Sequence, residues 1–272
     1  MFLKLMYITN NLKVAKIAEK YGVNRIWVDL ETLGKEERQG HLDSVKSSHS
    51  IEDIKKIKPF LNTAEMLVRV NPINENSIEE INKVIEAGAD MIMLPMWKSL
   101  QDIKTFLEIV KGRVKSTLLL ETKEAVECLD EVLKNGGFDE IHIGLNDLHL
   151  SYNLSFMFEP LTNGIVEDIC EKIKKYNIPY GFGGIAKLGE GKLPAEKILM
   201  EHYRLGSSRV ILSRSFCNTN VINNIDEIEN IFRKNLNDLY KYEEELEKRK
   251  EEDFIINKLN IKKDVESIIK NI

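Results

Sequence analysis

Acidic side chains stand at the ends of several short apolar runs in this sequence. The run RIWVDLE contains Asp29 and Glu31, and the run STLLLET contains Glu121. The run IHIGLNDLH carries Asp147 directly after its apolar part. A carboxylate in such a place costs desolvation energy unless it pairs or holds a cation, and a lone one is more often a helix cap or an ion-pair partner. Glu121 and Asp147, on successive predicted strands, would suit a hard divalent cation.

The available ligands favour magnesium or manganese over zinc. The three cysteines are isolated, and no His-rich spacing accompanies Glu121 and Asp147. Oxygen ligands without paired cysteines indicate Mg2+ or Mn2+. With two protein carboxylates the cation would keep open positions, which could chelate an α-keto acid and stabilise the enolate formed when a carbon–carbon bond breaks or forms. Arg69, in the run EMLVRVN, would add a second positive charge at that oxygen, with a planar fork that suits it better than lysine.

Histidines supply the candidates for proton transfer. The loop ETLGKEERQGHLDSVKSSHS carries His41 and His49. Either is a plausible proton shuttle because the pKa of histidine lies near working pH, although an exposed loop histidine is more often idle. We expect His142, within an apolar run, to be packed, and His149 to orient a ligand or water.

These residues need elements that bring them together. Eight short apolar runs alternate with segments of helical spacing, and they span residues 2–8, 25–31, 65–71, 90–96, 116–122, 139–145, 179–185 and 208–214. Several helical segments end on glycine just before the next run, as in EAGADMIML. This alternation favours a closed (β/α)8 TIM barrel, with an open doubly wound sheet as the alternative. In such a barrel the chemistry lies where the strands end.

The end of the chain is predicted to be a helical extension. Residues 1–219 would form the barrel, and residues 220–272 would supply its eighth helix and a tail. Apolar residues recur in the tail at helical spacing, and they are Phe254, Ile255, Leu259, Ile261, Val265, Ile268 and Ile269. This stripe could pack on its own barrel or on a neighbouring subunit, and we expect it to pack across an interface in a homo-oligomer.

Composition limits the partners. The chain has 272 residues, 43% of them hydrophobic, and its 39 basic and 44 acidic residues give a net charge of -5. That balance offers no electrostatic footprint for nucleic acid. The first residues contain neither a long apolar segment nor a signal-peptide cleavage site, and the isolated cysteines indicate reduced thiols. We therefore expect a soluble, cytoplasmic protein that does not enter a membrane.

Several motifs in register carry a family resemblance. VDLE, VRVN, GADMIMLPM, LLLET, IGLNDL and GFGGI, in this order and spacing, resemble the HpcH/HpaI aldolase and citrate lyase β-subunit family of phosphoenolpyruvate/pyruvate-binding barrels, over roughly residues 20–216. The resemblance implies a (β/α)8 barrel, a divalent metal on Glu121 and Asp147, and Arg69 at the keto-acid oxygen. It also implies cleavage or formation of a carbon–carbon bond beside a carbonyl.

The chain departs from this family in two places. Pyruvate aldolases of the family have a glutamine two residues before the metal-binding glutamate, where this chain has Leu119. Their Gly-Glu-His pattern, which supplies a general base, is absent after the second predicted strand. The first difference removes one polar contact and weighs against plain pyruvate as the substrate, and the second leaves the general base to the loop with His41, Lys46 and His49.

Further substrate contacts are expected around the same rim. Backbone N–H groups of Gly183 and Gly184, with Ser213 and Arg214, could bind a phosphate or a second carboxylate. Close packing of small residues explains these glycines equally well. Glu31 and Asn146 complete the expected substrate-binding set.

The sequence thus predicts a Mg2+- or Mn2+-dependent lyase that acts by aldol or Claisen chemistry on an α-keto acid or an acyl thioester such as an acyl-CoA. Phosphoryl or phosphonate chemistry on phosphoenolpyruvate in the same superfold is one alternative. A non-catalytic barrel that binds a small acid is another.

Overall fold

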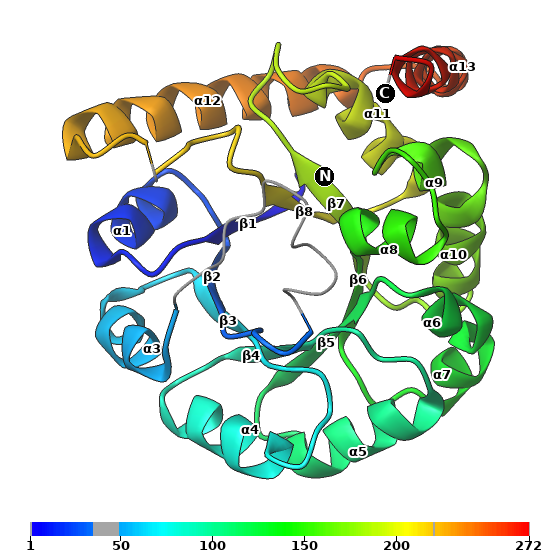
Figure 1. Cartoon of the computed structure of the whole chain (residues 1–272). Coiled ribbons are helices and arrows are strands. Elements are labelled where there is room, and N and C mark those ends of the chain that lie inside the picture. The colour runs from blue at the N-terminus through cyan, green and yellow to red at the C-terminus, as the bar shows by residue number, and fades with distance from the viewer. Residues whose placement is uncertain (1, 35–48, 220, 272) are drawn as a thin grey trace.

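Eight parallel strands close into a barrel in sequence order (Figure 1). The computed structural model describes residues 2–34, 49–219 and 221–271. The predicted (β/α)8 barrel is confirmed, and each of the eight predicted runs overlaps one strand. The strands are β1 (Lys4–Ile8), β2 (Arg25–Asp29), β3 (Glu65–Arg69), β4 (Met91–Leu94), β5 (Lys115–Leu120), β6 (Glu140–Ile143), β7 (Tyr180–Ile185) and β8 (Arg209–Leu212).

Helices surround the strands on the outside (Figure 1). They are α1 (Leu12–Lys20), α3 (Ile51–Ile57), α4 (Ser77–Glu86), α5 (Leu100–Val110), α6 (Lys123–Glu127), α7 (Leu129–Asn135), α10 (Ile165–Lys174), α11 (Ala195–Leu205) and α12 (Ile225–Leu246). The short helices α8 (Leu145–Ser151) and α9 (Glu159–Thr162) follow β6, a 3-10 turn η1 (Lys58–Phe60) follows α3, and α13 (Glu251–Ile269) ends the chain. None of the helices in the described ranges is long and apolar enough to cross a membrane.

Side chains alternate between two cores along each strand. Ile26 and Val28 of β2 face the helices and belong to the large outer core. Trp27 lies between them and points into the barrel. There it meets a separate apolar cluster from the neighbouring strands, made of Met6, Leu67, Met91, Met93 and Leu119. Burial on both faces explains why these runs are almost continuously apolar.

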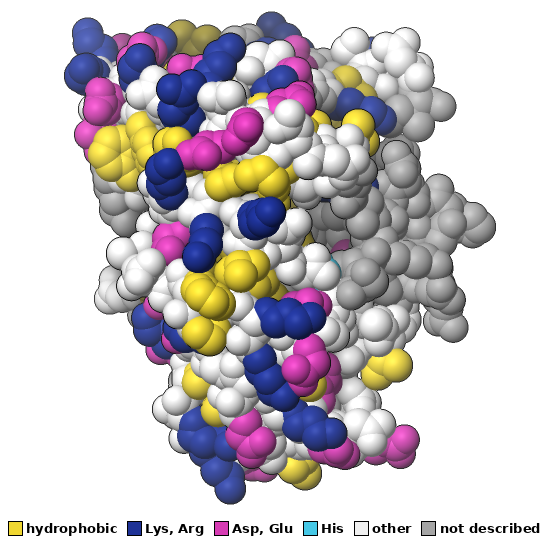
Figure 2. Space-filling model, turned by 90° about the vertical axis from the view of Figure 1, so that its left-hand side faces the viewer, with side chains coloured by type: hydrophobic (Ala, Val, Ile, Leu, Met, Phe, Trp, Pro, Cys, Tyr) yellow, Lys and Arg dark blue, Asp and Glu magenta, His cyan; other side chains and the backbone are white. Residues whose placement is uncertain are grey.

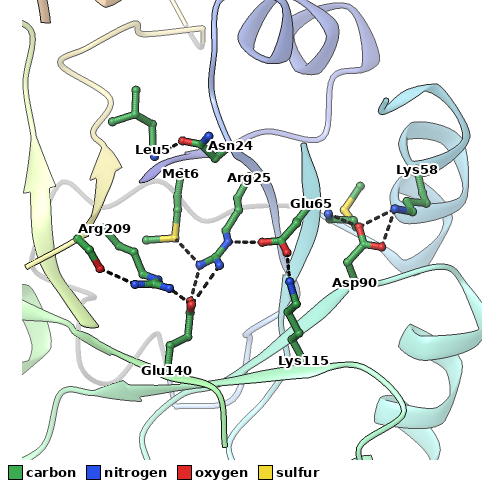
Figure 3. A network of polar contacts seen from close by, with 12 residues as sticks. Leu5, Met6, Asn24, Arg25, Lys58, Glu65, Asp90, Lys115, Glu140 and Arg209 are labelled. Atoms are coloured by element: carbon green, nitrogen blue, oxygen red, sulfur yellow. Dashed lines mark hydrogen bonds and ion pairs between the residues drawn. The ribbon is translucent and has the colours of Figure 1, made fainter. Parts of the chain in front are cut away.

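Ion pairs occupy the end of the barrel where the strands begin (Figure 3). Arg25, the first residue of β2, is almost fully buried, and its Nε donates to Glu65 at 2.8 Å. Its Nη2 donates to Glu140 at 3.1 Å, and Arg209 Nε donates to the same carboxylate at 2.6 Å. Lys115 pairs with Glu65. Because each buried charge meets an opposite one, this layer can lie in the barrel interior.

The last two helices have different positions. The helix α12 contacts α1 and α11, so it completes the outer ring, whereas α13 packs on α11 and α9. Ile261 and Val265 of α13 are buried against the chain's own core. Ile255 and Leu259 are 49% and 57% exposed. The predicted apolar stripe therefore divides into a face that packs on this barrel and a face that is open.

The charged surface is mixed in sign where Figure 2 shows it, on the side of α1 and α3. Lysine and arginine side chains alternate there with aspartate and glutamate side chains. Two ion pairs of these helices also join opposite charges. Lys55 pairs with Glu52 within α3, and Lys20 of α1 pairs with Glu229 of α12. Such a face has no concentrated field of one sign, in agreement with the near balance of charges in the sequence.

Candidate active site

Strand periodicity places three predicted site residues at the mouth of the barrel. Trp27, Leu67 and Leu119 face the barrel interior, and two positions later the same strands or their ends carry Asp29, Arg69 and Glu121. Successive inward-facing residues are two apart, so all three side chains project inward at the carboxyl ends of β2, β3 and β5. This is the end opposite the ion-pair layer.

Arg69 is held by two carboxylates. Its Nε donates to Asp29 Oδ1 at 2.8 Å and its Nη2 to Asp29 Oδ2 at 2.9 Å, while Nη1 lies 3.1 Å from Glu31 Oε2. Burial lowers the pKa of Arg69, but the two carboxylates outweigh burial and the pKa lies above its ordinary value. The guanidinium also lies over the Trp27 ring, at 5.3 Å from its centre. Arg69 is therefore a fixed and permanent cation at the rim.

Glu121 and Asp147 lie close enough to influence one another. Glu121 follows β5 directly and is 2% exposed, and Asp147 is 7% exposed. Burial raises the pKa of Glu121 well above its ordinary value, and the neighbouring Asp147 raises it further, against the opposing effect of Arg69. Glu31 also raises this pKa. Four of the predicted site residues thus share one electrostatic neighbourhood.

Asp147 does not end a strand, which corrects the sequence-based prediction. The strand β6 stops at Ile143, and Asp147 is the third residue of α8. The helix forms because Leu145 and Leu148 bury one face, and because Leu148 N–H donates to the Gly144 carbonyl at 3.0 Å. The carboxylate therefore reaches the rim from a helix that follows β6, instead of from the strand itself.

The donor set fits Mg2+ or Mn2+. In the part of the chain that the structure describes, no group of three or more His, Cys, Asp or Glu side chains could hold a metal. Glu121 and Asp147 would be the protein ligands, and two carboxylates with water and substrate are typical of Mg2+. Asp147 raises the pKa of Glu121 because the two negative charges repel one another. A divalent cation bound by both carboxylates would offset that repulsion.

Two backbone features that the sequence did not predict hold Glu121. The Met96 N–H donates to Glu121 Oε1 at 3.0 Å, and Met96 has a left-handed backbone with φ 52°. On the other side, a Cβ on Gly144 would lie 2.8 Å from Glu121 Oε2. Gly144 could have been noticed as the residue that ends an apolar run before Asp147. Nothing in the sequence signals the conformation of Met96, because methionine has no preference for that region.

Gly183 and Gly184 lie within β7. The Gly183 carbonyl accepts a hydrogen bond from His142 Nε2 at 3.2 Å, and its φ is 51°. A Cβ on Gly183 would lie 2.8 Å from Leu145 of α8. Gly183 is therefore closely packed against Leu145, and its lack of a side chain makes room for the helix that carries Asp147. A role of either glycine in anion binding stays a prediction.

Of the two predicted loop histidines, the structure describes His49 but not His41, which like Lys46 lies outside the described residues. His49 accepts the Asp29 backbone N–H on Nδ1 at 3.0 Å, which places its ring at the carboxyl end of β2.

The other histidines have buried positions. His142 is buried, as predicted, and burial lowers its pKa to about 3, so it is neutral. His149 is buried in α8, two residues after Asp147. Two residues correspond to a rotation of about 200° around a helix, so His149 faces away from Asp147 and is poorly placed to orient a ligand there. Asn146, half-buried, lies in the first turn of the same helix.

A hollow of about 1040 Å³ opens at the same end of the barrel, between the end of β8 and the start of α12. Ser213 lines it, and its N–H donates to the Ile185 carbonyl at 2.8 Å. The basic residues Lys187, Arg214 and Lys234 also line it. Gly183 and Gly184 are not among the lining residues.

A closed (β/α)8 barrel with an arginine and buried carboxylates at its carboxyl-terminal mouth has the arrangement typical of a barrel enzyme. The chain belongs to the HpcH/HpaI aldolase/citrate lyase family, whose model matches residues 5–156. The predicted family is thereby confirmed. Among curated protein sequences, none matches this chain.

Solved structures of distant sequence share the fold. The HpcH/HpaI aldolase from Desulfitobacterium hafniense DCB-2 is similar with a TM-score of 0.60 and 14% identity, over 78% of this chain and 86% of that chain. An HpcH/HpaI aldolase/citrate lyase family protein from Burkholderia cenocepacia J2315 gives 0.63 and 12%, over 84% and 95%. A citrate lyase from Burkholderia xenovorans LB400 gives 0.60 and 13%, over 85% and 77%.

Proposed function

We propose that this protein is a divalent-metal-dependent carbon–carbon lyase that acts by aldol or Claisen chemistry on an α-keto acid or an acyl thioester. The observation that carries the proposal is the pair of buried carboxylates, Glu121 and Asp147, beside the fixed cation Arg69. A Mg2+ or Mn2+ ion held by the two carboxylates would stabilise the negative charge that develops on the carbonyl oxygen of the substrate.

Arg69 has donors left for a substrate. A guanidinium has five N–H groups. The described contacts with Asp29 and Glu31 engage three of them, which leaves two. These can bind a carboxylate or a developing enolate oxygen while Asp29 keeps the plane of the guanidinium fixed.

The remaining substrate contacts are proposed from position. Glu31 adjoins Arg69, Asn146 adjoins Asp147, and Ser213 lines the hollow at the end of β8. A substrate larger than pyruvate would extend from the carboxylate pair toward Ser213, into a hollow lined by both basic and acidic side chains. Gly183 and Gly184 would act there through the backbone. Proton transfer would involve His49 or His41.

A test that needs no knowledge of the natural substrate is the exchange of pyruvate methyl protons with D2O, followed by NMR. Exchange reports enolate formation, so the protein should catalyse it only when Mg2+ or Mn2+ is added. Glu121→Gln and Asp147→Asn should each lower the exchange rate by roughly 100-fold or more, because each removes one anionic ligand. Glu124→Gln, at an exposed position one turn away, is the matched control.

Two outcomes would contradict the proposal. One is exchange at the same rate without metal, and the other is full exchange in both carboxylate variants. Release of inorganic phosphate from phosphoenolpyruvate, without exchange on pyruvate, would favour the phosphoryl-transfer alternative instead.

A further inference from the structure

We infer that Gly144 and Met96 are positioning residues for the Glu121 carboxylate: the backbone N–H of Met96 holds one oxygen, and the missing side chain of Gly144 leaves room for the other. The inference rests on the proposed metal site and names the two features, a backbone N–H and an absent side chain, that present Glu121 to the cation. Neither residue binds the cation itself.

Gly144 acts by lacking a side chain. Its φ is -84°, which any residue can adopt, so the reason for glycine is space and not backbone freedom. A Cβ would lie 2.8 Å from Glu121 Oε2, 3.0 Å from Glu121 Cβ and 3.3 Å from Leu119 Cδ1. Leu119 and the base of Glu121 are fixed in β5 and at its end. The carboxylate tip is the part that can move, so a methyl group at position 144 would turn it away.

Met96 acts from the opposite side through its backbone. Its N–H donates to Glu121 Oε1 at 3.0 Å, from the segment that follows β4. A left-handed backbone is unfavourable for methionine and persists only when its surroundings enforce it. In this conformation the backbone N–H of Met96 points at the buried carboxylate of Glu121.

The two contacts act on different oxygens of the same group. Met96 holds Oε1 by a hydrogen bond and Gly144 leaves free the space beside Oε2, so the carboxylate keeps an orientation that a side chain at position 144 would exclude. Gly144 also accepts the N–H of Leu148, so it begins the helix that carries Asp147. A change at Gly144 is therefore expected to reach both proposed metal ligands.

The decisive variant is Gly144→Ala, with Mn2+ affinity measured by calorimetry. Partners of metal ligands typically change affinity by roughly 10- to 100-fold when altered, and we expect a loss in that range. Met96→Gly keeps the N–H and should bind Mn2+ nearly as the parent does. Gly164→Ala, where a Cβ meets nothing within 4 Å but φ is 98°, controls for a glycine replaced at a strained position. It should melt earlier and keep its Mn2+ affinity.

A compensating change makes the test specific. Glu121→Asp shortens the side chain and withdraws the carboxylate from the new methyl group. In the double variant Gly144→Ala/Glu121→Asp the loss of affinity should be smaller than the product of the two single losses. Multiplicative losses, or a Gly144→Ala variant with the affinity of the parent, would overturn the inference.

A second measurement works without metal. The Met96 amide proton, followed by 1H–15N NMR in metal-free protein, should shift in Gly144→Ala toward its position in Glu121→Ala, where the acceptor is gone. If Gly144→Ala leaves that proton at the position of the parent, the inference is wrong. A parent protein that binds no Mn2+ would contradict the proposed function, while the NMR result would still decide whether Gly144 positions Glu121.

Discussion

Arg69 shows how a buried cation can be both fixed and available. Asp29 binds it in two places and Glu31 in a third, so its orientation does not depend on a substrate. A lysine could offer the charge but not the planar fork, because one ammonium cannot hold both carboxylates and still donate to a substrate in a defined direction.

Arg69→Lys should therefore affect turnover more than metal binding. We expect the rate of pyruvate proton exchange to fall by roughly 100-fold, since the lost contact matters most when charge develops on the oxygen. Mn2+ affinity should change by less than about threefold, because Arg69 is not a ligand. Exchange kinetics and calorimetry on the same samples measure the two effects. An unchanged exchange rate would make Arg69 a purely structural partner of Asp29.

At the level of residues, the sequence predicted which side chains meet but not how they are held. Arg69 and Glu121 could be grouped because the carboxyl ends of barrel strands converge. The hydrogen bond from Met96 and the acceptor role of His49 Nδ1 depend on loop conformations that have no sequence signature. Local conformation of this kind is imposed by the folded surroundings, so a pattern of residue types cannot contain it.

At the level of elements, the pattern of apolar residues was sufficient to predict the strands, but it did not predict the helix α8. Each apolar run is buried on both faces, which makes its strand easy to recognise. The segment after β6 has leucines at Leu145 and Leu148, which fit the continuation of the apolar run as well as a helix. The ion-pair layer was also missed, because Arg25 and Glu65 at strand starts resemble ordinary polar flanks until the barrel closes around them.

The docking of α12 provides a pH-dependent contact. Glu243 of this helix is fully buried, and its Oε1 accepts the Leu3 N–H at 2.8 Å and the Tyr203 hydroxyl at 3.2 Å. Burial raises the pKa of Glu243 to about 7 in spite of these donors, from an ordinary value of 4.5. The folded protein therefore retains a proton that the unfolded chain has already released.

The sign of the effect on stability follows from linkage. This carboxyl contributes stability that is fully present below pH 4.5 and is lost as the pH rises through about 7. Glu243→Gln, which does not titrate, should abolish that decline, and the variant should gain stability over the parent as the pH rises, by up to about 3 kcal/mol. Thermal melts from pH 5 to 8 measure the difference. Glu244→Gln, on the exposed side of α12, should melt in parallel with the parent, and a parallel Glu243→Gln would refute the expectation.

At the level of the whole molecule, the ion-pair layer and the proposed site lie at opposite ends of the barrel. The beginning of the strands is filled by matched charges around Arg25 and Glu140, and the carboxyl end carries Arg69, Glu121 and Asp147. The matched ion-pair layer fills one end without leaving a buried charge unpaired, and it does not restrict the loops at the opposite mouth.

The last helix, α13, is held to the barrel by polar as well as apolar contacts. Besides the burial of Ile261 and Val265, Asn257 of α13 donates to Glu201 of α11 at 3.1 Å, and Lys258 lies 2.6 Å from Glu167 of α10. These contacts are intramolecular and they involve two different helices of the ring. They explain why one face of the predicted apolar stripe needs no second subunit.

Removal of the chain after Asp253 should therefore destabilise the barrel itself. The loss of the buried apolar contacts and of the partner of Glu201 should lower the melting temperature by roughly 5 °C or more. Self-association is a separate prediction, because it depends on the exposed face formed by Ile255, Ile256 and Leu259. A triple replacement of these three by serine should reduce the mass measured by light scattering while its melting temperature falls less than that of the truncated chain. A triple variant with the parent's mass would show that this face does not mediate assembly, and a truncated chain that melts with the parent would show that α13 does not stabilise the barrel.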